Sequence, residues 1–426
     1  KPLGVALDKR IEAVDRKKHD FDSLKLVTLH FDGEMEPRDL RGSNGFKGRL
    51  FFAQPGDVIY SKIDVRNGAI GVISDEFGTA AVSSEYPVYR IKPETALPQY
   101  IKLLFRTSFF RDAINSMISG ASGRKRVQPS QLEQIEIPLP PLPVQRAIVE
   151  RWRAAQASVA AAGERIARIE RETQARFLAD LDLTLPERAI PPKAFALKWQ
   201  DLERWSVMFN QLASVGVDVT TGKYPVAALG EIAAVSYGIQ KCPANRPGQH
   251  ARPYLRVANV QRGQLDLSEI KYINVPDSEM PSLRLAPGDL LFVEGNGSHA
   301  ELGRCAIWHG EIADCVHQNH ILKVRPNGET LLPDYAMTWF NTEAGKDHFF
   351  RNVKSSSGLG SINSTELRSA PIPLPPLSVQ RVIMERVEAG RAGIAREREA
   401  ADRLRRETQA DVEAMILGTK PVEVST

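Results

Sequence analysis

The sequence predicts an α+β protein: two mixed α/β globular domains separated by two long antiparallel coiled-coil helices, with the second half related to the first by a pseudo-twofold duplication. Three observations carry this prediction. They are a proline-rich phrase that occurs twice, a heptad pattern after each occurrence, and short β-branched runs before each occurrence. The chain has 426 residues, which is long enough for two or more hydrophobic cores.

An ordered series of matching motifs reveals the duplication. Residues 137–152, IPLPPLPVQRAIVERW, return at 372–387 as IPLPPLSVQRVIMERV, 235 positions later. RETQA at 171–175 returns at 406–410 with the same offset, and LPQY is matched by LPDY. Further upstream, QPGDVIYSK is matched by APGDLLFVE at an offset of 232, as expected if loop lengths differ between the copies. A period this long indicates a duplicated domain with its helix and not a solenoid of small units.

Each proline-rich phrase is followed by apolar or small residues at alternating steps of four and three, the spacing of a coiled-coil seam. We predict helices from about Val144 to Asp180 and from about Val379 to Leu417, each roughly 55 Å long at 1.5 Å per residue. Matched seams rich in Ala and Gly favour antiparallel packing of one helix on the other; the alternative is that each helix only covers its own domain. Glu397 is a mismatch in the second seam. The predicted seam positions are Ile148, Trp152, Ala155, Val159, Ala162, Ile166, Ile169 and Thr173, and Ile383, Val387, Gly390, Ile394, Ala401, Leu404 and Thr408.

Each globular part mixes strand-like and helical segments. Runs punctuated by Gly, Pro and Asp, such as RLFFAQPGDVIYSK and NHILKVRP, predict strands and turns. One amphipathic helix is predicted in each part, near residues 98–119 and 333–353. The phrase ALGEIAAVSYGIQK at 228–241 has no comparable phrase in the first copy. The predicted boundaries are a first domain at 1–142, a first helix segment at 143–184, a Pro-rich linker at 185–200, a second domain at 201–377, a second helix segment at 378–418 and a tail at 419–426.

Composition narrows the class of protein. The formal net charge of +4 and the pI of about 8.8 permit a polyanionic partner without demanding one. Three cysteines, Cys242, Cys305 and Cys315, are too few for a disulfide framework and agree with a reducing compartment. The stretch CVHQNH at 315–320 matches no four-ligand zinc pattern, so no metal site is predicted. Because the sequence has no apolar run of about 18 residues and no signal-like start, we expect a cytoplasmic protein.

The sequence does not contain the residues and spacings of the common enzyme motifs. GVDVTTGKY has the wrong glycine spacing for a phosphate loop and places Tyr224 where a magnesium-binding Ser or Thr is needed. The adenine-methylating Asp/Asn-Pro-Pro-aromatic tetrapeptide does not occur, nor does a nucleophile elbow or a His-Glu-x-x-His helix. The chain is therefore predicted to have no catalytic activity alone.

The motif series as a whole resembles the specificity subunit of type I restriction-modification systems. In that family two target-recognition domains alternate with two conserved long helices, and each recognition domain closes with Pro-Leu-Pro-Pro-Leu followed by Gln. Here this signature occupies residues 138–145 and 373–380, and the PGD turn and the Ser-Gly loop are also similar to the family pattern. The resemblance covers nearly the whole chain.

The resemblance implies a non-catalytic DNA-recognition subunit whose two domains, held apart by a coiled-coil ruler, read a bipartite asymmetric target. It implies double-stranded DNA as the partner of the recognition domains. It also implies DNA methyltransferase subunits, expected to be two, as partners of the long helices, and a restriction-motor subunit as an optional further partner. S-adenosylmethionine is expected on the methyltransferase, and no cofactor in this chain. The alternative is a coiled-coil scaffold or adaptor that binds proteins and no nucleic acid.

Candidate DNA contacts in the first domain lie on two loops, because base reading needs forked donors and amides while phosphate binding needs cations. SGRKRVQPS places three cations after a glycine, although a solvated charge run would look the same. The loop after the strand that follows the PGD turn is the second candidate. The alternative is that its residues differ between the two copies only through the ordinary drift of surface loops. The predicted DNA-binding residues here are Ser61, Lys62, Arg66, Ser122, Gly123, Arg124, Lys125 and Arg126.

The second domain carries different residues at matching places. Its loop SSSGLGSINS has no cation, and YGIQKCPANR adds an aromatic residue, an amide and two cations. Residues 318–320 are candidate groove contacts, with packing at a strand end as the alternative. The predicted DNA-binding residues of this domain are Tyr237, Gln240, Lys241, Arg246, Asn296, Ser298, His299, Gln318, Asn319, His320, Ser356, Ser357, Ser361 and Asn363.

Overall fold

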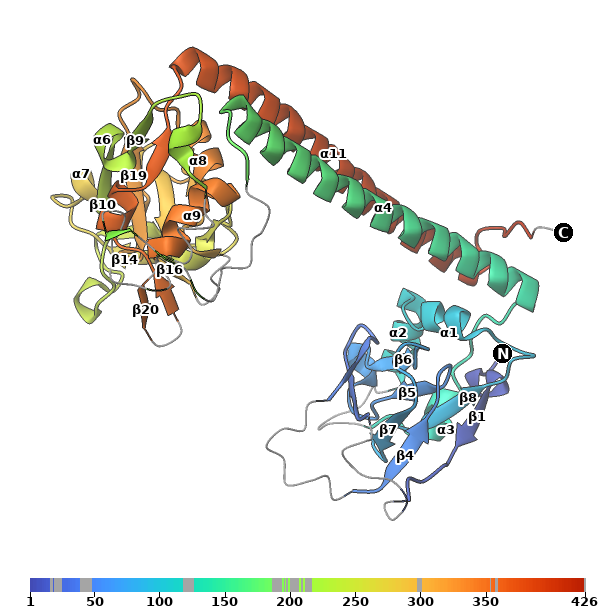
Figure 1. The fold of residues 1–426 in the computed structure, drawn as a ribbon. Helices are drawn as coiled ribbons and strands as arrows, with labels where there is room; N and C mark the ends of the chain where they lie inside the picture. Colours follow the sequence, from blue (N-terminus) through green and yellow to red (C-terminus); the bar gives the residue numbers. More distant parts are fainter. Residues whose placement is uncertain are drawn as a thin grey trace. The chain divides into compact units, whose positions relative to one another are not determined.

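The computed structural model of the chain forms two compact units (Figure 1). The first unit comprises Lys1–Arg165 and Glu397–Thr426, and the second comprises Ile166–Arg396. Among the described residues no helix is long and apolar enough to span a bilayer. The structure describes residues 1–15, 18, 25–38, 48–117, 126–185, 194, 196, 198, 199, 207, 210, 217–296, 301–352, 354–356 and 359–424.

An antiparallel four-stranded sheet of order β1-β8-β5-β6 forms the centre of the first unit. The run RLFFAQPGDVIYSK, predicted to contain strands and turns, includes a fully buried strand, β5, which lies inside the sheet between β8 and β6. The four strands are β1 (Leu7–Arg10), β8 (Val88–Ile91), β5 (Val58–Tyr60) and β6 (Ile70–Val72). Besides the two helices described below, the other elements of this unit before the long helix are η1 (Leu3–Ala6), β2 (Val27–Leu29), β3 (Met35–Pro37), β4 (Leu50–Ala53), η3 (Val65–Asn67), β7 (Ala80–Ser83) and α3 (Pro129–Glu133).

The second unit has an antiparallel sheet of corresponding order, β10-β19-β15-β17. These strands are β10 (Ala233–Tyr237), β19 (Ile321–Pro326), β15 (Leu290–Val293) and β17 (Cys305–Ile307). Its further strands are β9 (Val226–Ala228), β11 (Ala251–Leu255), β12 (Val260–Gln261), β13 (Gln264–Leu265), β14 (Lys271–Asn274), β16 (Gly295–Asn296), β18 (Val316–His317), β20 (Lys354–Ser356), β21 (Leu359–Ser361) and β22 (Pro371–Pro373). Its short helices are η5 (Val219–Thr221), α6 (Leu229–Ile232), η6 (Pro243–Asn245), η7 (Val257–Asn259), α7 (Met280–Leu283) and α10 (Ser364–Arg368).

The start of the first unit corrects one sequence-based expectation. The phrase ALGEIAAVSYGIQK does have a counterpart, LGVALDKR, which forms η1 and β1 as the second phrase forms α6 and β10. Leu3 N–H donates to Ile135 O at 2.8 Å, and Leu229 N–H donates to Ala370 O at 3.0 Å. The two phrases differ in sequence because β1 and β10 are edge strands with one exposed face, where side chains can diverge while the backbone pairing is kept.

The single amphipathic helix predicted in each unit is instead a pair of helices, because a threonine ends the first helix and caps the second. Thr107 Oγ1 donates to Leu104 O at 2.7 Å and accepts from Phe110 N–H at 3.2 Å. Thr342 makes the same two bonds one copy later, to Trp339 O at 2.7 Å and from Gly345 N–H at 3.0 Å. The helices are α1 (Pro98–Leu104), α2 (Ser108–Ser116), α8 (Pro333–Asn341) and α9 (Glu343–Asn352).

The glutamine of the proline-rich phrase is a buried clamp. Gln145 is fully buried, and its Oε1 accepts from Leu97 N–H at 2.9 Å. Its Nε2 donates to Thr95 O at 2.9 Å and to Pro140 O at 2.8 Å. The clamp therefore joins the loop before α1 to the proline-rich segment and to the long helix.

The second unit repeats this clamp. Gln380, also fully buried, accepts from Leu332 N–H at 2.9 Å and donates to Thr330 O and Pro375 O, both at 2.8 Å. Because the prolines of the phrase lack N–H donors, its carbonyls have few local partners, and the glutamine amide satisfies one of them in each copy, that of Pro140 or Pro375.

Two unbroken helices follow the clamps. They are α4 (Leu142–Asp180), 39 residues, and α11 (Leu377–Ile416), 40 residues, each about 60 Å long at 1.5 Å per residue. Within the first unit they run antiparallel, since Arg151 pairs with Asp411 at 3.5 Å and Arg165 with Glu397 at 2.9 Å.

Most predicted seam positions form the least exposed stripe of each helix, including Trp152, Val159, Ile166 and Ile169 on α4 and Ile394 and Leu404 on α11. The mismatch at Glu397 is explained by Arg165, whose Nε and Nη2 both donate to its Oε2, at 3.0 and 2.9 Å. The outermost predicted positions instead belong to the cores of the globular parts. Ile148 packs in the core of the first unit, and Ile383 and Val387 in that of the second.

Replacing Gly390 with alanine is expected to destabilise the helix pair of the second unit. A Cβ at Gly390 on α11 would overlap the side chain of Thr173 on α4, and overpacking of this kind typically costs about 1–3 kcal/mol. Gly163 on α4 is the matched control, because a Cβ there meets no atom within 4 Å. Gly163→Ala should therefore stabilise its helix by about 0.5–1 kcal/mol. Thermal unfolding measures both variants, and shifts in the same direction would contradict this packing.

Candidate nucleic-acid interface

Predicted residues from separate segments of the second unit meet at one end of its four-stranded sheet. Ile239 N–H donates to His317 O at 2.8 Å, and Asn319 N–H donates back to Ile239 O at 2.9 Å. The predicted segments 237–241 and 318–320 are therefore neighbours. Gly238 permits this approach, since a Cβ there would overlap the His317 carbonyl oxygen.

Two further segments join the same frame. Glu294 N–H donates to His320 O at 3.0 Å, and Ile362 N–H donates to Glu294 O at 2.8 Å. Beyond Glu294, strand β16 pairs with β21, which pairs with β20. Figure 1 shows β16 and β20 at the end of the second unit that lies away from α11. We call the surface formed by Tyr237, Glu294, His320 and Ser361 the second frame.

Side chains in the second frame are held by specific contacts. His320 Nδ1 lies 2.7 Å from Glu294 Oε2, with the Glu294 side chain 24% and the His320 side chain 56% exposed. Tyr237 is 44% exposed, and its hydroxyl accepts from Ser364 N–H at 3.1 Å. Ser361 is exposed at the end of β21.

The remaining predictions in this unit divide by environment. Gln240, Lys241 and Arg246 are exposed on one loop, while Gln318 and Asn319 are half-buried between strands. Asn363, predicted as a loop contact, is instead the N-cap of α10, where its Oδ1 accepts two backbone N–H groups.

The predicted loop SSSGLGSINS is in part a β-hairpin, because β16 offers an edge with which β21 pairs. Ser356 lies in β20 and Asn296 in β16. Ser298, His299 and Ser357 lie outside the described residues.

The first unit builds the same frame from other residues. Lys62 N–H donates to Glu85 O at 3.1 Å, and Val127 N–H donates to Lys62 O at 2.8 Å. These bonds match those of Glu294 with His320 and Ile362, so Lys62 corresponds to Glu294 and Glu85 to His320. The Lys62 ammonium donates to Ser84 O at 2.7 Å, and Arg126 pairs with Glu85 at 3.3 Å. We call Lys62, Glu85 and Arg126 the first frame.

Two predicted contacts of the first unit lie elsewhere. Ser61 is buried, 6% exposed, and its Oγ accepts from Asp64 N–H at 3.1 Å, so it shapes a turn and does not face a ligand. Arg66 lines a different cavity from Lys62, one of about 320 Å³ that it shares with Phe31 and Arg106. Ser122, Gly123, Arg124 and Lys125 lie outside the described residues.

Sequence reasoning missed Ile11 and Glu85. Ile11, the residue after β1, occupies the position of Tyr237. Arg10 at the end of β1 pairs with Val88, whereas Tyr237 at the end of β10 pairs with Leu322, one residue before the counterpart of Val88 in β19. Ile11 is 78% exposed and lines a cavity of about 270 Å³ together with Lys62. The alternation within LDKRIEAV would place Ile11 on the same strand face as the buried Leu7, so its exposure has no signal in the sequence.

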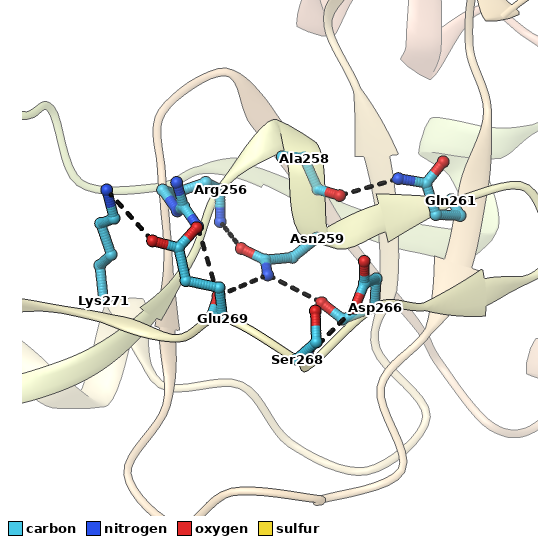
Figure 2. A network of polar contacts seen from close by, with 8 residues as sticks. All are labelled: Arg256, Ala258, Asn259, Gln261, Asp266, Ser268, Glu269 and Lys271. Atoms are coloured by element: carbon cyan, nitrogen blue, oxygen red, sulfur yellow. Dashed lines mark hydrogen bonds and ion pairs between the residues drawn. The ribbon is translucent and has the colours of Figure 1, made fainter. Parts of the chain in front are cut away.

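A separate polar network stiffens residues 256–271 of the second unit (Figure 2). Asn259 is buried; its Oδ1 accepts from Arg256 N–H at 2.8 Å, and its Nδ2 donates to Asp266 O at 2.8 Å and Glu269 O at 3.0 Å. The Arg256 and Lys271 side chains both pair with Glu269, at 2.7 and 3.4 Å, and the Arg256 hydrogen bond lowers the pKa of Glu269. Glu269 offsets the charge of one of these two cations, so the pairing reduces the positive charge that the network offers a phosphate.

No group of three or more His, Cys, Asp or Glu within the described part of the chain is placed to hold a metal ion. Cys315, in the stretch CVHQNH, and Cys305 are both buried, and burial raises the pKa of the Cys315 thiol to about 12. His317 is fully buried, and desolvation lowers its pKa to about 4.

Both units match one family of known proteins. The model of the type I restriction modification DNA specificity domain matches residues 44–171 and 283–401, together more than half of the chain. The chain therefore belongs to this family of specificity subunits, and the resemblance inferred from its sequence is confirmed.

Individual relatives agree with the family. The chain is 26% identical over 308 residues to the type I restriction enzyme EcoKI specificity subunit of Escherichia coli K12, covering 70% of this chain and 60% of that protein. It is 24% identical over 307 residues to the StySPI specificity subunit of Salmonella potsdam, covering 70% and 59%. The matches thus span about 60% of the length of these curated relatives. A solved chain from work on complex assembly and conformational transition of the type I R-M system has the same fold, with a TM-score of 0.59, 18% identity and coverage of 98% of this chain and 96% of that chain.

Proposed function

We propose that this chain is the sequence-specific DNA-recognition subunit of a type I restriction-modification complex. Each unit reads one half of a bipartite, asymmetric target. The observation that carries this proposal is the pair of frames: the backbone bonds of Lys62 and Glu294 are the same, while the side chains they present differ in charge. A shared scaffold with divergent surface residues is what two readers of unlike half-sites need.

The long helices serve as the ruler in this proposal, and the two copies are related as a pseudo-twofold pair. Unbroken helices of 39 and 40 residues, joined by ion pairs and by the close approach of Gly390 to Thr173, support a stiff spacer. Helix length then sets the number of unread base pairs between half-sites.

The chemistry belongs to partner subunits. Two DNA methyltransferase subunits dock on this chain and carry S-adenosylmethionine, and a restriction-motor subunit joins when cleavage is part of the system. The chain itself supplies recognition and no catalytic group. The type I restriction enzyme specificity subunits among its relatives support this assignment.

Binding and methylation together test this function. With its methyltransferase partner, the chain should methylate one bipartite motif with a constant gap, as measured by sequencing the methylated bases of a cell that carries both. Binding to that duplex should weaken on the order of 10³-fold between 50 and 200 mM salt, because phosphate contacts release counterions. The competing role as a protein scaffold predicts no retarded DNA at any salt concentration, and that result would remove the proposal.

A further inference from the structure

We propose that Glu294 and His320 read the exocyclic amino group of a cytosine or adenine in the half-site bound by the second unit. This inference rests on the proposed function and names the residue pair that sets one base of its specificity. Glu294 directly follows β15 and His320 directly precedes β19, two neighbouring strands of the central sheet. Both are therefore placed by the most buried part of the unit.

The pair is held in one geometry by two contacts. The backbone bond from Glu294 N–H to His320 O measures 3.0 Å, and the side chains meet at 2.7 Å between Oε2 and Nδ1. Both side chains remain partly exposed, at 24% and 56%. A pre-organised exposed pair loses little side-chain entropy when a base edge binds.

The hydrogen-bonding chemistry of this pair selects its ligand. A carboxylate accepts hydrogen bonds and cannot donate them, so the Nδ1 that contacts Glu294 must carry the proton. In its neutral form His320 then presents Nε2 as an acceptor, and Glu294 Oε1 is an acceptor in either charge state of the ring. Two acceptors suit a donor, and in the major groove the donors are the N4 amino group of cytosine and the N6 amino group of adenine.

Phosphate is a poor ligand for the same pair, because the carboxylate repels it. The first frame has the opposite character: Lys62 stands at the position of Glu294, and Arg126 near it adds a forked donor. Donors of this kind suit guanine O6 and N7 or a phosphate. The two units therefore present different charges on one backbone frame: acceptors in the second, and in the first two cations beside the single carboxylate of Glu85.

The test compares the target of the full chain with that of two variants, each with the methyltransferase partner, on a library of randomised half-sites. Glu294→Gln is expected to lose about tenfold to hundredfold of the preference for cytosine or adenine at one base pair of the second half-site. His320→Ala should weaken the preference at that same base pair, because it frees the Glu294 side chain. The first half-site and the gap should stay unchanged in both.

Glu329→Gln is the matched control, since Glu329 is exposed just beyond the opposite end of β19 from His320. It should leave the target unchanged, and thermal unfolding should show all three variants folded. An unchanged base preference in Glu294→Gln, or a uniform loss of affinity for every sequence, overturns the pair as a base reader. Should the unaltered chain select no bipartite target, the proposed function fails instead, so the two failures are distinguishable. If one variant does not fold, the other decides the outcome.

Discussion

Replacing Gln380 with alanine is expected to lower the free energy of unfolding of the second unit by about 3–5 kcal/mol. The amide of this fully buried side chain satisfies Leu332 N–H, Thr330 O and Pro375 O, at 2.8 to 2.9 Å. Alanine leaves all three groups without this partner; the bond to Pro375 is buried and those to Leu332 and Thr330 are half-buried. A group buried without a partner costs about 1–3 kcal/mol. Water entering the vacated space offsets part of this cost. The loss is therefore large against the total stability of a typical domain.

Hydrogen–deuterium exchange resolved by peptide is the suitable measurement, because it reports each unit separately where a single melting curve does not. Gln380→Ala should raise exchange in β15 and β19 and leave β5 and β8 unchanged. Gln145→Ala, which removes the matching clamp of the first unit, should do the reverse. Gln156→Ala, at an exposed position on α4, is the control and should change neither. Protection that is equal in Gln380→Ala and the unaltered chain would show that the clamp contributes nothing.

The elements that depend on periodicity could be predicted from the sequence. Helices α4 and α11 lie within two residues of their predicted bounds, because an a/d pattern sustained over four heptads strongly favours a long helix. The single helix predicted in each unit was wrong, because Thr107 and Thr342 look ordinary in sequence and reveal their capping role only through bonds to both neighbouring helices.

Surface positions were harder to predict, because they depend on which strand ends become neighbours. Lys62 and His320 were both chosen from their loops, and the offset of 232 between QPGDVIYSK and APGDLLFVE already aligns Lys62 with Glu294. That Glu85 corresponds to His320, and that these positions are neighbours within each unit, comes from cross-strand backbone bonds. Ser61 failed for a related reason: it is buried, and its hydroxyl bonds to the backbone of the turn that follows it.

Acidification from pH 7 to pH 4 is expected to destabilise the second unit through one buried side chain, His317. Burial, followed in size by the nearby Lys323 ammonium, lowers the pKa of this imidazole from 6.5 to about 4. Its Nδ1 lies 3.0 Å from Ile321 O, and its Nε2 has no hydrogen-bond partner within the described residues. The folded chain therefore holds a neutral ring over a pH range in which the unfolded chain has already taken up a proton.

This difference sets the direction in which stability changes with pH. The stability that the neutral ring gives the folded chain is fully present above pH 6.5, where neither the folded nor the unfolded chain is protonated at His317. It falls as the pH drops towards 4 and is fully lost below pH 4. The loss amounts to roughly 3 kcal/mol.

Carboxylates titrate over part of this range too, so the measurement is the difference in unfolding free energy between the unaltered chain and His317→Gln, taken from urea unfolding at several pH values. That difference should shrink steadily from pH 6.5 to 4. The same comparison with His309→Gln, at an exposed histidine of the same unit, should stay flat. A difference for His317→Gln that does not change with pH would mean that the buried ring is protonated in the folded protein.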